Sequence, residues 1–357
     1  MSRSSPENVM TGADAIRLAT AEAMAADSGV IVMGLGVPDP KGVFGTTTGL
    51  QDEFGVNRVF DIPCAENAVT GVAIGAALGG YRPILTHQRV DFALLSVEQI
   101  VNQAAKWRYM FGGKMHVPLV VRMIVGRGWG QGPQHSQALH SWFAHIPGLK
   151  VVLPVFPQDA RDLLLLSVQD DDPVIYIEHR WLHGIKGAVK GGKPRLPLGR
   201  AAIVREGKDV TIAAFSYMVL EALEAAKRLA EEGISAEVID MRCARPLDAD
   251  TLLASVRKTG RFVAADIAGA SCGLASELVS VVSRGAHASL QAAPEIVVLP
   301  DCPTPTSPAL AAGFYPRAAH VLAAVRRTLG LPVDPQLFAV PAGAELDKPD
   351  PAFTGPF

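Results

Sequence analysis

The sequence has few cysteines, few aromatic residues and little net charge. Its four cysteines among 357 residues are scattered, without the spacing of a metal or redox motif, which suits a reducing cytoplasm. The net charge of −2 argues against nucleic acid as a main partner. Aromatic residues make up only 6% while alanine and glycine are plentiful, a composition that fits helices packed closely on sheets.

Long apolar runs are missing as well. The N-terminal stretch MSRSSPENVMTGADA lacks the apolar core of a signal peptide. No uncharged apolar stretch reaches the length of a membrane span, so we expect a cytoplasmic protein without a membrane partner. A hydrophobic content of 49% against 19% charged residues indicates a large buried core, and the length leaves room for about two domains.

Short apolar strands alternate with helices in both halves of the sequence, which is typical of open parallel α/β sheets. In the first half the predicted strands are 29–34, 58–60, 83–87, 117–125, 150–154 and 174–178, and the helices include 11–27, 92–111 and 158–169. In the second half the predicted strands are 210–215, 236–240, 262–266 and 296–299, with helices at 218–232, 248–258 and 271–283. We therefore predict a first domain at 8–183, a linker at 184–199, a second domain at 200–330 and a proline-rich tail at 331–357.

Three polar features of the first predicted domain follow strands. Glu66 begins an apolar, small-residue helix after one strand, His87, Gln88 and Arg89 follow the next, and His135 follows a third. Ligands of open α/β sheets bind beyond the carboxyl ends of the strands, so we expect these features to line one rim. A carboxylate sunk into apolar surroundings needs a partner, and for Glu66 we expect a cofactor; the alternative is simple stabilisation of the helix dipole.

A series of motifs keeps its order and spacing along both halves. It includes Gly42-Val43-Phe44, Arg58-Val59-Phe60-Asp61, Pro63 with Glu66, Asp91-Phe92, QIVNQAAK at 99–106, His135-Ser136-Gln137, PGLKVV at 147–152 and EVIDMR at 237–242. In these motifs the chain resembles the β subunit of the thiamine-diphosphate-dependent dehydrogenase component of 2-oxo acid dehydrogenase complexes, of the pyruvate, branched-chain and acetoin types.

The resemblance implies an α/β, transketolase-like fold: a pyrimidine-binding domain followed by a transketolase C-terminal domain, each an open parallel sheet. It implies decarboxylation of a small 2-oxo acid and transfer of the acyl unit, usually to lipoamide on an acyltransferase core. The family's α subunit holds the diphosphate and Mg²⁺ through a Gly-Asp-Gly motif, which this sequence lacks. The resemblance therefore implies a site shared with an α subunit, usually in an α2β2 heterotetramer.

The resemblance also assigns roles to single residues. Glu66 would bond N1′ of the aminopyrimidine and promote its imino tautomer, and His135 would serve the substrate as a donor or proton shuttle. Cys64, Gln88 and Phe92 fall at positions around the pyrimidine ring. The alternatives are a small buried hydrophobe for Cys64, a strand-end amide bonded to backbone for Gln88 and an ordinary core ring for Phe92.

Some positions depart from the family pattern. His87 and Arg89 replace apolar or small residues and are candidates for substrate choice, although Arg89 could pair with Asp91 or Asp61. Near Asp266 the family often has His-Glu, and the histidine is missing here. These departures keep open a non-oxidative two-subunit transketolase-like enzyme or carboligase, besides a non-catalytic scaffolding subunit.

A potassium site is a further expectation from the resemblance. Ser167, Asp170 and Asp172 lie where the family binds structural K⁺, largely through backbone carbonyls. The alternative for this stretch is a solvated acidic turn.

Overall fold

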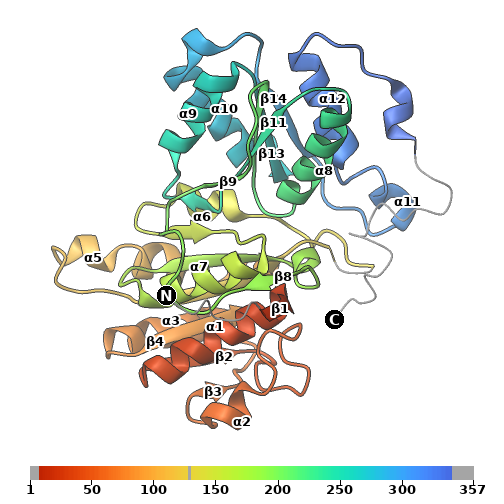
Figure 1. Cartoon of the computed structure of the whole chain (residues 1–357). Helices are drawn as coiled ribbons and strands as arrows, with labels where there is room; N and C mark the ends of the chain where they lie inside the picture. Colours follow the sequence, from red (N-terminus) through yellow and green to blue (C-terminus); the bar gives the residue numbers. More distant parts are fainter. Residues whose placement is uncertain (1–7, 128–129, 340–357) are drawn as a thin grey trace, which may run out of the picture. The chain divides into compact units, whose positions relative to one another are not determined.

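The computed structural model describes residues 8–127 and 130–339, which form two compact units (Figure 1). The first unit contains 8–126 and 142–198, and the second contains 127, 130–141 and 199–339. The segment that carries His135 therefore belongs to the second unit, although we predicted it within the first domain. Of the predicted tail, residues 340–357 lie outside the described part.

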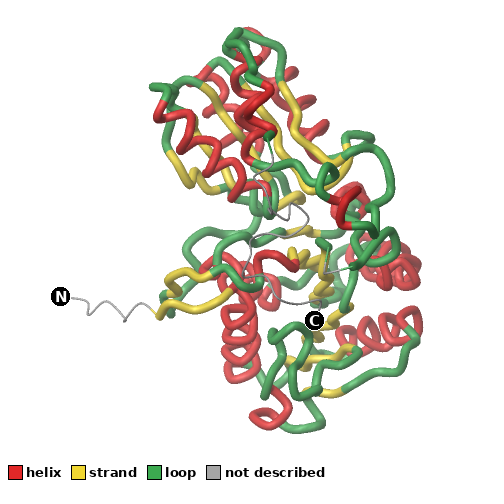
Figure 2. Tube along the Cα trace, turned by 90° about the vertical axis from the view of Figure 1, so that its right-hand side faces the viewer, coloured by secondary structure: helices red, strands yellow, loops and turns green. Residues whose placement is uncertain are grey.

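The first unit is built on a parallel sheet in the order β6-β7-β5-β4-β2-β3. Its strands are β2 (Val30–Gly34), β3 (Val59–Phe60), β4 (Arg82–His87), β5 (Val120–Val125), β6 (Lys150–Val152) and β7 (Val174–His179). The sequences of β2, β5 and β7 are almost unbroken apolar runs with every residue buried, because helices cover both faces of such sheets. Figure 2 shows helices on either side of the strands.

Helix ends in the first unit follow local rules of capping. Helix α1 (Gly12–Ala26) starts with a capping box in which the Thr11 hydroxyl accepts a bond from the Asp14 amide at 3.1 Å. Helix α7 (Pro157–Gln169) has proline in its first turn and packs on α1. The other helices are α2 (Leu50–Phe54), α3 (Glu66–Leu78), α6 (His140–His145), which runs in from the second unit, and the 3₁₀ turn η3 (Arg180–Leu182).

The long helix predicted at 92–111 is wrong. The chain forms α4 (Val90–Ala93), a 3₁₀ turn η1 (Leu94–Ser96), a π-helix η2 (Gln99–Ala104) and α5 (Trp107–Met110). The Ala105 amide donates to the Ile100 carbonyl at 3.0 Å, five residues back, which is the π-helical pattern. A Cβ at Gly148 would overlap the Ala105 carbonyl, so this wide turn is packed directly against another backbone.

The predicted linker is partly ordered in a strand. Strand β8 (Lys186–Val189) pairs antiparallel with β1 (Asn8–Thr11), with Asn8 opposite Val189 and Thr11 opposite Lys186. Both strands belong to the first unit. The glycines and lysines of this stretch indicated a linker, and they did not reveal a pairing partner at the other end of the unit.

The second unit has a sheet in the order β14-β13-β10-β11-β9, parallel except for β9. Its strands are β9 (Ala202–Arg205), β10 (Val210–Ala214), β11 (Ala236–Asp240), β13 (Phe262–Gly269) and β14 (Glu295–Leu299), with a short β12 (Cys243–Arg245). The helices are α8 (Met218–Glu231), α9 (Ala249–Thr259), α10 (Leu274–Gly285), α11 (Pro308–Ala311) and α12 (Ala318–Thr328), with turns η4 (His287–Ser289) and η5 (Pro335–Phe338). Two open α/β sheets are thus confirmed. None of the described helices is long and apolar enough to cross a membrane.

Candidate functional site

Glu66 is the first residue of α3, and its carboxylate lies in the first turn of that helix. The side chain is half-buried, and the neighbouring Cys64 is exposed. Among the described residues its side-chain contact is Cys64 Sγ, at 3.9 Å from Oε1. The deep burial that we expected for Glu66 is therefore wrong for the single chain. The carboxylate is instead accessible to a group that comes from outside this chain.

The loop after β2 is tied to the ends of β3 and β4. The Asp61 carboxylate accepts a bond from the Gly36 amide at 3.0 Å, and Gln88 Nε2 donates to the Leu35 carbonyl at 3.0 Å. Gly36 has a φ of +74°, where a Cβ would also press on the Gln88 amide. The three strand ends therefore form one rim. The Gln88 nitrogen bonds to backbone, as the alternative interpretation of this residue required, and Phe92 lies half-buried on α4.

His87 is the last residue of β4, and only 3% of it is exposed. Burial lowers the pKa of the His87 imidazole to about 4. Its Nε2 has no hydrogen-bond partner among the residues that the structure describes. His87 is therefore a neutral buried ring at physiological pH, and its role in substrate choice stays a prediction.

Arg89 is also buried, at 2% exposure. Its Nη1 donates to the Gly126 carbonyl at 2.5 Å, and its guanidinium lies 5.4 Å from the centre of the Phe44 ring. Arg180 approaches the same ring at 4.9 Å, and burial lowers its pKa. Phe44 has a φ of +51° in its loop. A buried and a half-buried cation therefore gather around one aromatic ring beyond the carboxyl ends of β4 and β7.

A buried ion pair joins β5 to β7 and was missed in the sequence. Arg122 Nε lies 2.6 Å from Glu178 Oε1, while Arg122 Nη2 donates to the Thr46 hydroxyl at 2.7 Å. His183 Nε2 lies 3.1 Å from the other Glu178 oxygen. Burial would raise the pKa of Glu178, but Arg122 and His183 outweigh it and lower that pKa to about 2. In the sequence, the signal for this ion pair was one charged residue, Arg122 or Glu178, within each of two largely apolar strands.

The second unit holds His135 in a segment attached to its own residues. His135 is half-buried, and its amide donates to the Gly132 carbonyl at 3.1 Å. Later in the segment, His140 Nε2 lies 2.9 Å from Asp266 Oδ1, and both side chains are fully buried. Asp266 therefore has a histidine partner in this chain, supplied from a distant part of the sequence. The structure places Glu66, Gln88 and Phe92 in the first unit and His135 in the second.

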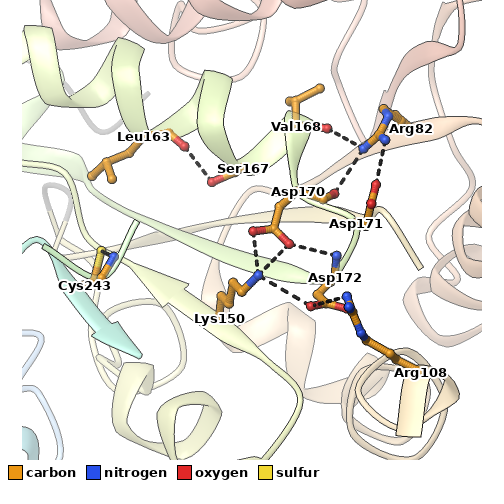
Figure 3. Close-up of polar contacts among 11 residues, drawn as sticks. Arg82, Arg108, Lys150, Leu163, Ser167, Val168, Asp170, Asp171, Asp172 and Cys243 are labelled. Atoms are coloured by element: carbon orange, nitrogen blue, oxygen red, sulfur yellow. Dashed lines mark hydrogen bonds and ion pairs between the residues drawn. The ribbon is translucent and has the colours of Figure 1, made fainter. Parts of the chain in front are cut away.

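The acidic turn after α7 is occupied by cationic side chains (Figure 3). Lys150 Nζ lies 2.6 Å from both Asp170 oxygens, and Arg108 Nη1 donates to Asp172 at 2.9 Å. The Ser167 hydroxyl donates to the Leu163 carbonyl at 2.6 Å. No group of three or more His, Cys, Asp or Glu side chains that could hold a metal ion occurs among the described residues.

Arg82 occupies the backbone carbonyls of the same turn (Figure 3). Its Nη1 donates to the carbonyls of Val168 at 2.9 Å and Asp170 at 3.1 Å, and its Nη2 donates to the Asp171 carboxylate at 2.8 Å. That last bond lowers the pKa of Asp171. A guanidinium thus neutralises the negative end of α7, and the potassium site at Ser167, Asp170 and Asp172 stays a prediction.

The two halves of the chain match two protein-family models. Residues 8–184 match the model "Transketolase, pyrimidine binding domain", and residues 199–321 match "Transketolase, C-terminal domain". A solved structure titled "Split gene transketolase, inactive beta4 tetramer" is 25% identical with a TM-score of 0.73, covering 90% of this chain and 99% of that one. The predicted transketolase-like fold is therefore confirmed.

Several curated proteins are similar along most of their length. The acetoin:2,6-dichlorophenolindophenol oxidoreductase subunit beta of Cupriavidus necator is 47% identical, over 84% of this chain and 89% of that protein. The mitochondrial pyruvate dehydrogenase E1 component subunit beta-2 of Oryza sativa is 41% identical, over 89% and 86%. The 2-oxoisovalerate dehydrogenase subunit beta of Bacillus subtilis is 40% identical, over 89% and 98%.

His87→Leu should weaken the loss of stability in mild acid. The folded-state pKa of about 4 lies below the ordinary 6.5, so between these values the unfolded chain binds a proton that the folded chain excludes. This linkage lowers the free energy of unfolding by about 2 kcal/mol at pH 5 relative to pH 7.5, and the leucine variant lacks it. Urea unfolding at both pH values measures the difference. His145→Leu, at an exposed histidine, is the control; equal pH dependence in all three proteins would contradict the prediction.

Arg82→Ala should lower the thermal midpoint, because it leaves two carbonyls and a carboxylate unmatched at the end of α7, a loss of about 1–3 kcal/mol. The wild-type midpoint should be the same in KCl and in choline chloride of equal ionic strength, whereas the variant should recover partly in KCl. Arg108→Ala, which removes an exposed ion pair from the same turn, is the control. Stabilisation of the wild type by K⁺ alone would show that the expected potassium site exists after all.

Proposed function

This chain belongs to the family of β subunits of 2-oxo acid dehydrogenases, and on that premise we propose that it forms a thiamine-diphosphate-dependent enzyme with an α subunit. The enzyme decarboxylates a 2-oxo acid and transfers the acyl unit to an acceptor, usually lipoamide. The observation that carries the proposal is the accessible Glu66 carboxylate at the start of α3, beyond the end of β3.

Glu66 fits the aminopyrimidine end of the cofactor. When bound, thiamine diphosphate would supply nucleophilic catalysis at a carbonyl group. Glu66 would hold a proton for the ring nitrogen N1′ and so promote the tautomer that this chemistry needs. Cys64 is the side chain in contact with the carboxylate, and Phe92 offers a half-buried ring on the neighbouring helix, so the aminopyrimidine finds a proton partner and an apolar neighbour.

The α subunit holds the other end of the cofactor. Gly-Asp-Gly is absent from the sequence, and the described residues contain no cluster of metal-binding side chains. The proposed assembly is an α2β2 heterotetramer in the cytoplasm, with Mg²⁺ and the diphosphate on the α subunit. Its formation would bury Glu66 and Cys64, which the single chain leaves partly or largely exposed.

His135 serves the substrate, as a hydrogen-bond donor to its carbonyl or carboxylate oxygen or as a proton shuttle. Of the two candidates for substrate choice, His87 is neutral because of its low pKa, so its contribution is steric. Arg89 would supply the attraction for an anionic group.

A second candidate is a non-oxidative two-subunit transketolase, which the similarity to the split-gene transketolase favours. Both enzymes use Glu66 in the same way, and they differ in the acceptor. Ketol transfer between sugar phosphates without lipoamide would support the transketolase, and strict dependence on lipoamide and an acyltransferase core would exclude it.

The proposal is tested with the chain purified together with its α subunit. The complex receives thiamine diphosphate, Mg²⁺, and pyruvate, branched-chain 2-oxo acids or acetoin, with dichlorophenolindophenol as an artificial electron acceptor. Reduction of the dye with one of these substrates is expected. No turnover of any of them by the loaded complex would exclude the oxidative enzyme.

Glu66→Gln should slow turnover by roughly 100-fold or more, because the amide cannot share its proton with N1′ as a carboxyl group does. NMR measurement of hydrogen–deuterium exchange at C2 of the cofactor should show a similar decrease, while the affinity for the cofactor changes less. Glu53→Gln, at an exposed carboxylate paired with Arg17, is the control. Unchanged exchange in the Glu66 variant would instead identify a non-catalytic, scaffolding subunit.

A further inference from the structure

The segment that carries His135 runs from Arg127 to His140. Both of its ends are attached to the second unit, and a cavity lies beside the residues between these two attachments. We propose that His140 and Asp266 are positioning residues, which hold this segment so that His135 meets the substrate. The inference rests on the proposed role of His135 in substrate turnover. It adds two residues to which neither the motif series nor the family match assigns a role.

The His140–Asp266 pair is the attachment at the C-terminal end of the segment. His140 Nε2 lies 2.9 and 3.2 Å from the two Asp266 oxygens, and both side chains are fully buried. Asp266 Oδ1 also accepts a bond from the Ile267 amide at 2.7 Å. Because a carboxylate faces Nε2, that nitrogen carries the proton and donates. A buried bond of this kind has a single good geometry, so it fixes the direction of the imidazole.

Asp266 is itself placed by the sheet. It belongs to β13, which pairs with β10 on one side and β14 on the other. Regular pairing on both sides extends to Ala265, the residue before Asp266. His140 is therefore attached to the sheet of the second unit directly after its regularly paired part.

Arg127 is the attachment at the N-terminal end. It is buried, and its Nη2 donates to the Thr306 carbonyl at 2.6 Å while its Nε donates to the Gln131 carbonyl at 2.9 Å. Gly132 also lies against Thr306, so closely that a Cβ would overlap the threonine hydroxyl. The segment is thus held before and after His135 by residues of its own unit.

Between these attachments the segment borders a cavity. A cavity of about 590 Å³ lies under residues 133–139, and its opposite wall includes 268–269 and 299–304. The lining is partly polar and includes Gln134, Ser136 and Asp301. The two attachments therefore bracket His135 from either side along the chain.

The experiment is a double-mutant cycle in the complete enzyme with its α subunit. His140→Ala and Asp266→Ala are introduced together, because removal of one partner alone would leave a buried group unpaired. We expect kcat to fall by about 10- to 100-fold, as for a misplaced catalytic group. In a His135→Ala background the same pair of changes should alter kcat less than about twofold, because the imidazole that the pair positions is already absent.

Three further measurements separate positioning from general damage. His140→Gln retains a donor for Asp266 and should recover most of kcat. Hydrogen–deuterium exchange at C2 of the cofactor, which depends on Glu66, should remain at the wild-type rate in all His140 and Asp266 variants. Ser276→Ala removes a bond to the Ala270 carbonyl in the same unit and should leave kcat unchanged.

Two results would overturn the inference: additive losses of kcat in the cycle, or a loss of C2 exchange together with kcat. Either result would mean that the His140–Asp266 pair acts on the fold and not through His135. If the paired alanines do not yield folded protein, the glutamine variant decides in their place, with Asp266→Asn beside it. Both conservative variants should keep most of kcat, and a large loss in either would overturn the proposal. An inactive wild-type enzyme would refute the proposed function instead.

Discussion

The first unit depends on the ion pair between Arg122 and Glu178. Each charge sits inside a largely apolar strand, and neither is accessible to water. Removal of one partner would leave the other charged in the core of the sheet, which costs about 3–5 kcal/mol. Through Thr46 and His183 the pair also binds the loop after β2 and the turn after β7. The same contact therefore joins two central strands and fixes two of the loops beyond their ends.

The rim around Glu66 follows from this arrangement. Parallel strands bring their carboxyl ends to one edge, and the bonds from Asp61 and Gln88 then join the ends of β2, β3 and β4. Glu66 starts its helix at this edge and is half-buried in the described part of the chain. The partial exposure of Glu66 in the single chain is what the proposed sharing of the site with an α subunit requires.

Much of the fold could be predicted from the sequence, because buried parallel strands are continuous apolar runs and α1 carries its own capping box. The π-helix at 99–104 could not be predicted. Its hydrogen bonds run five residues back where those of an α-helix run four, and the pattern of apolar residues in the sequence is similar for both. The pairing of β1 with β8 was equally hidden, because it joins the two ends of a unit. In the candidate site, Glu66 and His135 were found through motifs, and their roles stay predictions. Arg122, Glu178, and the partnership of His140 with Asp266 were missed, because a contact between distant residues leaves no local pattern.

The path of the chain between the two units limits how they can be separated. The chain passes from the first unit to the second after Gly126, returns after Ser141, and leaves again after Leu198. A cut at the last of these points would leave the His135 segment on a fragment without Thr306 and Asp266, which attach it. The units are therefore not interchangeable modules. Recombination that exchanges the C-terminal half for that of a relative would keep the histidine and discard its supports, so the two halves are constrained to evolve together.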